Sequence, residues 1–322
     1  MKNIESGYLK PDQNLTKPFS TDHTMKIKTT SKIKQRIKTI PLVKSQEETP
    51  VVGVDVSSIH IGETASGHLY AIRGAIVWKV KKKYTYQRIG PFPFHITEQN
   101  KKEIHKLFRN NYFELSESNI FSMQNKMGNL LERWLQLGIS SSTYGAIILW
   151  DGSMTAGLIN SPVEELNRIL DVARNRLNTV LAFSKNTTLR FFGQKLTDYA
   201  GSTIPPYLLE IDGLDSSLWQ FLSLGNIYVA KLTPGICSFR LDIDKKIPQE
   251  QTITAVQNLI GSDLLIQSYP ETLRLAHIYS TFTATEVIGI QRFISQQYKL
   301  KIIHRPNVRK ILFGSFGKGA EE

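Results

Sequence analysis

The sequence predicts an α/β protein built on one mixed sheet flanked by helices. Two apolar runs that resemble buried strands carry an aspartate at or near their end, Asp55 in residues 51–56 and Asp151 in residues 145–151. A run that is apolar on both faces is typical of a strand in the middle of a covered sheet. Helix-like and strand-like segments alternate along the chain, and this alternation is the second observation that indicates the α/β class.

We expect three antiparallel strands in the first half of the chain, with a short connection between the first two and a lysine-rich turn between the last two. Thr97 is a good N-cap for the helix that follows, and Gly138 is expected to end the next one. The expected elements are strands at 51–56, 69–80 and 84–89, helices at 98–108 and 118–137, and a strand at 145–151. Three antiparallel strands followed by alternating helices and strands is the order of a ribonuclease H-like sheet.

In the second half, apolar residues recur at helical spacing after Ser161-Pro162, which supplies a cap and a proline at the first helical position. We therefore expect one helix from Pro162 to Leu181. The other expected elements are strands at 187–192, 207–211, 226–232, 237–243 and 264–266, and helices at 249–260, from Tyr269-Pro270 onward, and at 284–298.

The charge is strongly positive and unevenly distributed. The 322 residues carry a formal charge of +12, and neither residues 23–46 nor residues 287–320 contain an acid. Such stretches attract polyanions, of which nucleic acid is the commonest in the cytoplasm, although a solvated tail without a partner has the same composition. We expect a basic, flexible N-terminal arm at 1–48, one folded domain at 49–300 and a basic tail at 301–322.

Several classes of protein are excluded by composition. No apolar run approaches the ~20 residues of a membrane span, and the N-terminus lacks the apolar core of a signal peptide, so a cytoplasmic protein that does not contact a membrane is expected. Cys237 is the single cysteine, which excludes an internal disulfide and a cysteine-based zinc site.

The two aspartates make a metal site plausible, because neighbouring strand ends would bring their carboxylates together. Hard divalent cations prefer oxygen ligands, and two ions about 3.5–4 Å apart can hold the attacking and leaving oxygens of a phosphodiester. The alternative is that Asp151-Gly152 is only a turn, since this dipeptide is common in turns.

Four segments in the same order resemble the NurA nuclease family, which works with HerA-type DNA translocases. They are Val54-Asp55-Val56-Ser57, Leu149-Trp150-Asp151-Gly152-Ser153, Phe239-Arg240-Leu241-Asp242, and Tyr269-Pro270 with Ala276-His277. The resemblance spans about residues 50–300, and Val56 departs from it because family members usually have glycine there.

The resemblance implies a ribonuclease H-like fold, a homodimer, and a nuclease that needs Mn²⁺ or Mg²⁺, with two ions, to cut single- and double-stranded DNA. The implied activity is exonucleolytic, with endonuclease activity as a possible addition. The implied role is DNA end resection and double-strand break repair beside a HerA-type hexameric ATPase.

Five residues carry the implied site. By the resemblance, Asp55, Glu132, Asp151 and His277 would be metal ligands, and Tyr269 would complete the catalytic set. Each has a structural alternative: Glu132 lies at the edge of an apolar helix stripe and would otherwise be solvated, with Glu114 in reserve. His277 and Tyr269 would otherwise be packed residues of the core.

Two other functions fit the same sequence. A catalytically silent DNA-binding or scaffold protein would keep the fold, but it would be expected to have lost one of the three acids. An RNA-cleaving or Argonaute-like enzyme would keep the carboxylates, because the choice between DNA and RNA depends on groove and 2′-OH contacts.

Overall fold

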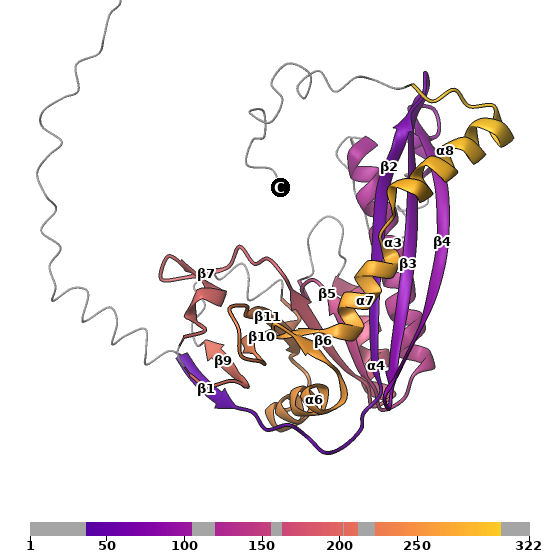
Figure 1. The fold of residues 1–322 in the computed structure, drawn as a ribbon. Coiled ribbons are helices and arrows are strands. Elements are labelled where there is room, and N and C mark those ends of the chain that lie inside the picture. Colours follow the sequence, from indigo (N-terminus) through magenta and orange to yellow (C-terminus); the bar gives the residue numbers. More distant parts are fainter. Residues whose placement is uncertain (1–36, 105–119, 156–162, 202, 212–222, 304–322) are drawn as a thin grey trace, which may run out of the picture.

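The protein is organised around one nine-stranded sheet (Figure 1). The computed structural model describes residues 37–104, 120–155, 163–201, 203–211 and 223–303. Across the sheet the strands are β1 (Ile37–Pro41), β9 (Tyr207–Ile211), β10 (Gly225–Lys231), β11 (Phe239–Asp244), β6 (Thr179–Ser184), β5 (Ile147–Asp151), β2 (Val51–Glu63), β3 (Gly67–Val80) and β4 (Lys83–Thr97).

The strand directions confirm the ribonuclease H-like sheet that the sequence predicts. β2, β3 and β4 form an antiparallel meander, whereas β5 and β6 run parallel to β2. From β6 outward, every neighbouring pair through β11, β10, β9 and β1 is antiparallel. The ends of β2, β5 and β6 therefore point the same way, except that β2 continues beyond the other two.

Helices cover both faces of the sheet. On one face, α3 (Ile120–Ser142) and α4 (Val163–Asn175) pack on alternate residues of β2 such as Val52 and Val54. On the other face, α6 (Gln249–Ser262) and α7 (Glu271–Ser280) pack on Val51 and on β5 and β6. α8 (Ala284–Tyr298) lies along the distal part of β2 and β3, as Figure 1 shows.

Two glycines let helices approach the central strands closely. A Cβ on Gly53 of β2 would lie 2.9 Å from the Thr272 carbonyl oxygen of α7. A Cβ on Gly74 of β3 would lie 2.4 Å from Leu135 Cδ1 of α3. The first contact is with backbone that cannot turn aside, so the glycine fixes how closely α7 lies on β2.

The expected helix from Pro162 to Leu181 is wrong at its C-terminal end. α4 stops at Asn175, Leu177 adopts a left-handed conformation with φ of 56°, and Leu181 is a buried residue of β6. Asn178 ends the helix because its side chain bonds to the backbone of Ser140 and Ala146. Apolar residues with helical spacing occur in α4, in the turn that follows it and in β6, so the sequence pattern did not reveal that β6 is a strand.

Other boundaries also differ. The expected arm at 1–48 includes β1, whose Ile40 packs in the core, while residues 1–36 lie outside the described part. Gly138 does not end α3, which continues to Ser142. Tyr269-Pro270 does not begin a helix but forms the short strand β13 (Tyr269–Pro270), which pairs with β12 (Leu265–Ile266).

The strand expected at 187–192 is shorter in the structure. It is reduced to β7 (Arg190–Phe191), which pairs with β8 (Gln194–Lys195), and a short 3₁₀ helix, η2 (Leu196–Tyr199), follows. Glu114 and most of the helix expected at 98–108 lie outside the described residues. Within the described part of the chain, no helix is both long and apolar enough to span a membrane.

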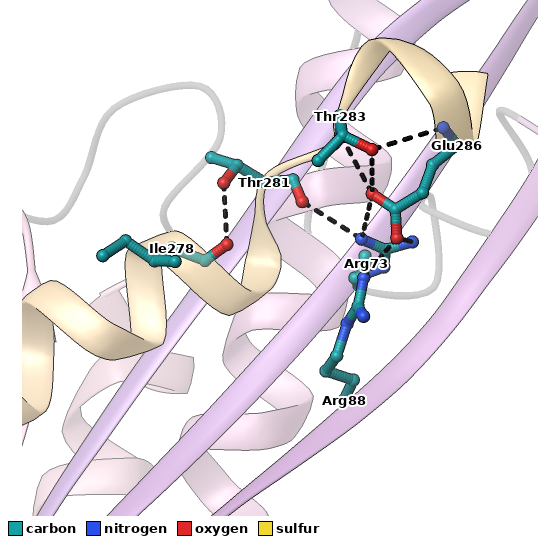
Figure 2. A network of polar contacts seen from close by, with 6 residues as sticks. All are labelled: Arg73, Arg88, Ile278, Thr281, Thr283 and Glu286. Atoms are coloured by element: carbon teal, nitrogen blue, oxygen red, sulfur yellow. Dashed lines mark hydrogen bonds and ion pairs between the residues drawn. The ribbon is translucent and has the colours of Figure 1, made fainter. Parts of the chain in front are cut away.

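A polar network fixes the turn between α7 and α8 to the sheet (Figure 2). The buried Arg73 of β3 donates to the Thr281 carbonyl at 3.0 Å and to Glu286 Oε2 at 3.2 Å, and its guanidinium lies 4.3 Å from the centroid of Phe282. Thr283 and Glu286 form a capping box at the start of α8. The C-terminal end of α7 is therefore held by a side chain of the central sheet.

Candidate metal centre

The side chain of Asp55 projects from β2 toward α7. Successive strand residues point to opposite faces, so Asp55 shares the face of Gly53, on which α7 lies. Ser280 donates a short hydrogen bond to Asp55 Oδ2, and His277 Nδ1 lies 3.3 Å from the same oxygen. Ser280 is also 2.8 Å from Ser57 Oγ, so one helical turn of α7 holds the Asp55 carboxylate.

Asp151 is the last residue of β5 and lies level with Asp55. The parallel register pairs Val54 with Trp150, which puts the two aspartates at the same height on neighbouring strands. Gly152 follows with φ of 131°, a backbone conformation that favours glycine, and its N–H donates to the Phe183 carbonyl at 2.7 Å. The strand therefore stops at the carboxylate, as the apolar run followed by Asp-Gly indicates.

Asp55, Asp151 and His277 each bring a ligand atom to one place. Two carboxylate oxygens and one imidazole nitrogen lie within 4.8 Å of one another. The two aspartate side chains are largely buried, whereas the His277 side chain is 47% exposed, so the group opens to solvent on the side of α7. This donor set fits a divalent cation that accepts both oxygen and nitrogen ligands.

Glu132 is not part of that three-residue group. It approaches from α3 on the opposite face of the sheet, where it lines a cavity of about 390 Å³ with Val56 and Ser58. Gln136 donates to Glu132 Oε1 at 2.9 Å. Burial is the main cause that raises the pKa of Glu132 to about 7; the charges of Asp55 and Asp151 raise it further, and Arg133 and Gln136 oppose the shift. The carboxylate thus lies within electrostatic reach of both aspartates, past the end of β5.

Tyr269 is packed beside Asp151 and is also unsatisfied. Its ring contacts Phe183 and Phe239 at centroid distances of 6.1 and 5.2 Å, as a core aromatic would. Its hydroxyl is buried and lies within reach of the Asp151 carboxylate, which contributes to its raised pKa, but the contact falls short of full hydrogen-bond geometry. Burial raises its pKa most, and the nearby Asp151 and Asp55 carboxylates add to the rise. A buried donor next to the carboxylate pair is what a bound oxygen ligand would satisfy.

Two residues of the site were missed by sequence reasoning. Lys185 Nζ lies 2.5 Å from Asp151 Oδ2 and 5.4 Å from the ring centroid of Tyr269. It follows β6 directly, so the wrong helix boundary hid its position at a strand end. Ser280 is three residues after His277, a spacing that places both on one helix face and could have identified it.

A buried ion pair supports the turn after Asp151. Asp242 of β11 is fully buried, and Arg240 donates to its two oxygens at 2.6 and 2.7 Å. Asp242 Oδ2 also accepts from the Met154 N–H at 3.0 Å. The expected strand motif Phe239-Arg240-Leu241-Asp242 therefore fixes the backbone three residues beyond the Asp151 carboxylate.

Comparison with solved structures agrees with the fold. The chain is similar to the NurA nuclease from Sulfolobus solfataricus, with 16% identity, 88% of this chain and 96% of that chain covered, and a TM-score of 0.50. It is also similar to a second NurA structure (9% identity, 86% and 95% covered, TM-score 0.46) and to Endonuclease V from Bacillus subtilis (13% identity, 86% and 94% covered, TM-score 0.37). No protein-family model matches the chain, and no curated protein matches it. At this identity the likeness establishes a NurA-like fold, as the four sequence segments indicate.

Proposed function

We propose that this protein is a divalent-metal-dependent DNA nuclease. The observation that carries the proposal is the convergence of Asp55 of β2, Asp151 at the end of β5 and His277 of α7 within 4.8 Å. The NurA-like fold supports the proposal, because the similar NurA structure is that of a nuclease and the similarity covers 88% of this chain.

Asp55, Asp151 and His277 would hold one ion, and Glu132 would contribute to a second. The oxygen-rich donor set fits Mn²⁺ or Mg²⁺, and the imidazole favours Mn²⁺ of these two. When bound, such ions polarise a phosphodiester and lower the pKa of water enough to supply a nucleophile near neutral pH.

The residues of the chain orient the reacting groups. Ser280 fixes the Asp55 carboxylate by its hydrogen bond, so that the oxygen facing His277 is defined. The buried Tyr269 hydroxyl donates to a phosphate oxygen placed beside Asp151, which satisfies its missing hydrogen bond.

Lys185 forms an ion pair with Asp151. Because its ammonium carries three donors on a flexible stem, Lys185 would be able to turn to a substrate phosphate if a cation were held beside Asp151. If His277 does not ligate the ion, its half-exposed side chain would instead assist the proton transfer to the leaving oxygen.

The substrate and the biological role belong to the same proposal. The acid-free stretches at 23–46 and 287–320 favour a polyanionic substrate, and the sequence resemblance favours single- and double-stranded DNA. From that resemblance we also propose a homodimer that acts with a HerA-type ATPase in DNA end resection and double-strand break repair.

A cleavage assay tests the proposal. End-labelled single- and double-stranded DNA, with RNA of the same sequence beside it, is incubated with the protein in Mn²⁺, Mg²⁺ or EDTA. We expect metal-dependent cleavage of DNA, its loss in Asp151→Asn, and its retention in Asp198→Asn, a matched change at an exposed aspartate.

Each other outcome points elsewhere. DNA binding without cleavage in any metal would move the protein to the non-catalytic scaffold class. Preferential cleavage of RNA would replace the substrate while leaving the metal centre in place. Undiminished cleavage by Asp151→Asn would remove that residue from the mechanism.

A further inference from the structure

Two histidines face each other at the distal ends of β2 and β3. His60 Nε2 lies 3.3 Å from His68 Nδ1, and the two ring centroids are 5.5 Å apart. His60 is five residues beyond Asp55 on the same strand, which corresponds to about 16 Å at the rise of a β-strand. The pair is therefore separate from the carboxylate centre.

The strand register explains why these side chains meet. β2 pairs His60 with Tyr70 and Glu63 with His68, with an irregularity between His60 and Gly62. Opposed residues of an antiparallel pair lie on the same face, so His60, Glu63 and His68 share one face of the sheet, although their ligand atoms do not all lie within 4.8 Å of one another. The irregularity shifts the register by the one residue that brings both histidines and the glutamate to the same side.

The spacing of the nitrogens matches a pair of metal ligands. Zinc binds histidine nitrogen at about 2.0–2.1 Å, so two nitrogens of a tetrahedral site lie about 3.3–3.4 Å apart. In the structure the same contact is a long hydrogen bond between the two rings. The distance of 3.3 Å between His60 and His68 therefore fits two ligands around one ion.

The surroundings favour neutral imidazoles beside a carboxylate. Burial lowers the pKa of His60 most, and the neighbouring His68 lowers it further, while Glu63 acts in the opposite direction. Neutral imidazole is the form that ligates a metal. The charge of Glu63 therefore reaches His60, and its carboxylate lies on the same strand face as both rings.

An independent observation comes from Tyr70. Its side chain is fully buried, its ring lies 5.1 Å from that of His60, and its hydroxyl makes no hydrogen bond within the described residues. Burial raises the pKa of Tyr70, and the Glu63 carboxylate contributes to the rise. A buried donor beside a carboxylate ligand is a typical outer partner in metal sites, where it fixes the ligand's orientation.

We propose that His60 and His68 hold a second metal ion of the late first-row Zn²⁺ class, and that Glu63 becomes the third ligand by rotation of its side chain toward the two rings. Two imidazoles and one carboxylate select Zn²⁺, Ni²⁺ or Cu²⁺ over Mg²⁺, in contrast to the oxygen-rich centre at Asp55 and Asp151. The bound ion cross-links β2 to β3 where the long meander extends beyond the rest of the sheet (Figure 1). Its role is to stabilise this extension, without a part in phosphodiester cleavage.

Zinc titration of the full chain, without an affinity tag, tests the site. Isothermal titration uses Zn²⁺ alone and an Asp55→Asn, Asp151→Asn protein, which removes the oxygen-rich centre. We expect this protein to bind one Zn²⁺, and we expect affinity to fall at least tenfold when His60→Ala or His68→Ala is added. Glu63→Gln should weaken binding to a smaller extent, because it leaves both imidazoles in place.

His95→Ala is the matched control. His95 pairs with Leu69 and so leaves β4 on the other face from His68, where its Nε2 lies 2.9 Å from Thr64 Oγ1. Zinc affinity should fall much less than tenfold in this variant, because His95 acts on His68 only through its charge. Zn²⁺ should raise the melting temperature of the His95→Ala protein but not of His68→Ala. Equal zinc affinity with and without His60 and His68, or loss of affinity only in His95→Ala, would overturn the proposal.

Discussion

Replacing Gly53 by alanine is the sharpest test of how α7 forms the candidate centre. A Cβ at this position would lie 2.9 Å from the Thr272 carbonyl oxygen, 3.1 Å from its carbonyl carbon and 3.2 Å from Leu273 Cα. Ordinary contact begins at 3.4 Å, so β2 and α7 must separate by about 0.5 Å, the difference between 3.4 and 2.9 Å. All three atoms belong to backbone, and none can rotate away.

The expected cost follows from that displacement. Overpacking a core typically costs about 1–3 kcal/mol, and the lower chain entropy of unfolded alanine returns about 0.4–1 kcal/mol. We expect a net loss of about 1–2 kcal/mol in the free energy of unfolding, or about 2–8 °C in melting temperature at 2–4 °C per kcal/mol. Metal-dependent cleavage should fall about tenfold, because His277 and Ser280 move with α7 and a misplacement of 1 Å can cost about 10²-fold.

The assay combines thermal melting with DNA cleavage, and Gly138→Ala is the control. Gly138 lies in α3 with nothing within 4 Å of its Cβ position, so alanine there should stabilise the protein by up to about 1 kcal/mol. A Gly53→Ala protein with unchanged melting temperature would refute the packing argument. A lowered melting temperature with full cleavage would show that the position of α7 does not control the site.

Three further predictions concern charged side chains. Partial burial would raise the pKa of Glu286, but hydrogen bonds from Arg73, the Thr283 N–H and Arg88 lower it to about 2 from 4.5. Stability from this group is therefore present above pH 4.5 and is lost as the pH falls toward 2. Because the Glu286 side chain is 30% exposed and solvent screens its ion pairs, we expect a contribution of about 1 kcal/mol, and melting curves of Glu286→Gln should lack this part of the acid dependence. The pKa of Glu132 is raised from 4.5 to about 7, so in EDTA the wild type should lose stability as the pH rises from 4.5 to 7 and then level off. Glu132→Gln should remove that slope, and an unchanged slope would assign it to another group. Lys185→Met should reduce cleavage about 10²-fold, by loss of a phosphate donor, yet tighten Mn²⁺ binding measured by titration, because Lys185 competes for Asp151; weaker Mn²⁺ binding would contradict the ion pair as described.

The central strands were predictable because their signal is local. An apolar run that ends on Asp151-Gly152 specifies a covered strand and its end without reference to the remainder of the chain, and strand 207–211 and helix 284–298 match β9 and α8. The strand β6 was not predictable in this way. Leu177 and Leu181 continue the spacing of α4, and the backbone reverses only because Asn178 bonds to the end of α3, a contact that spans 38 residues.

The residues of the candidate site also differ in whether a local sequence signal predicts their position. Asp151 stands at a strand end that the sequence marks, whereas Asp55 lies inside β2, which continues to Glu63; the register of β2 and β5 brings the two together. His277 needed the resemblance, since its position over Asp55 depends on Gly53 and on the fixed end of α7. The position of Lys185 follows from the end of β6, so no spacing rule could predict it. Glu132 lies on the face of the sheet opposite α7, and this position follows from the packing of α3.

The edge position of β1 sets a length scale for how far the sheet extends from the candidate centre. Six strand spacings of about 4.8 Å separate β1 from β2, so Ile37 lies up to about 29 Å across the sheet from the line of Asp55. Stacked base pairs are about 3.4 Å apart, so this offset corresponds to eight or nine base pairs. If the proposed substrate lies across the sheet, the exposed Lys38 of β1 would contact a duplex nearly one helical turn away from the phosphate beside Asp55, and a shorter substrate would be held without this contact.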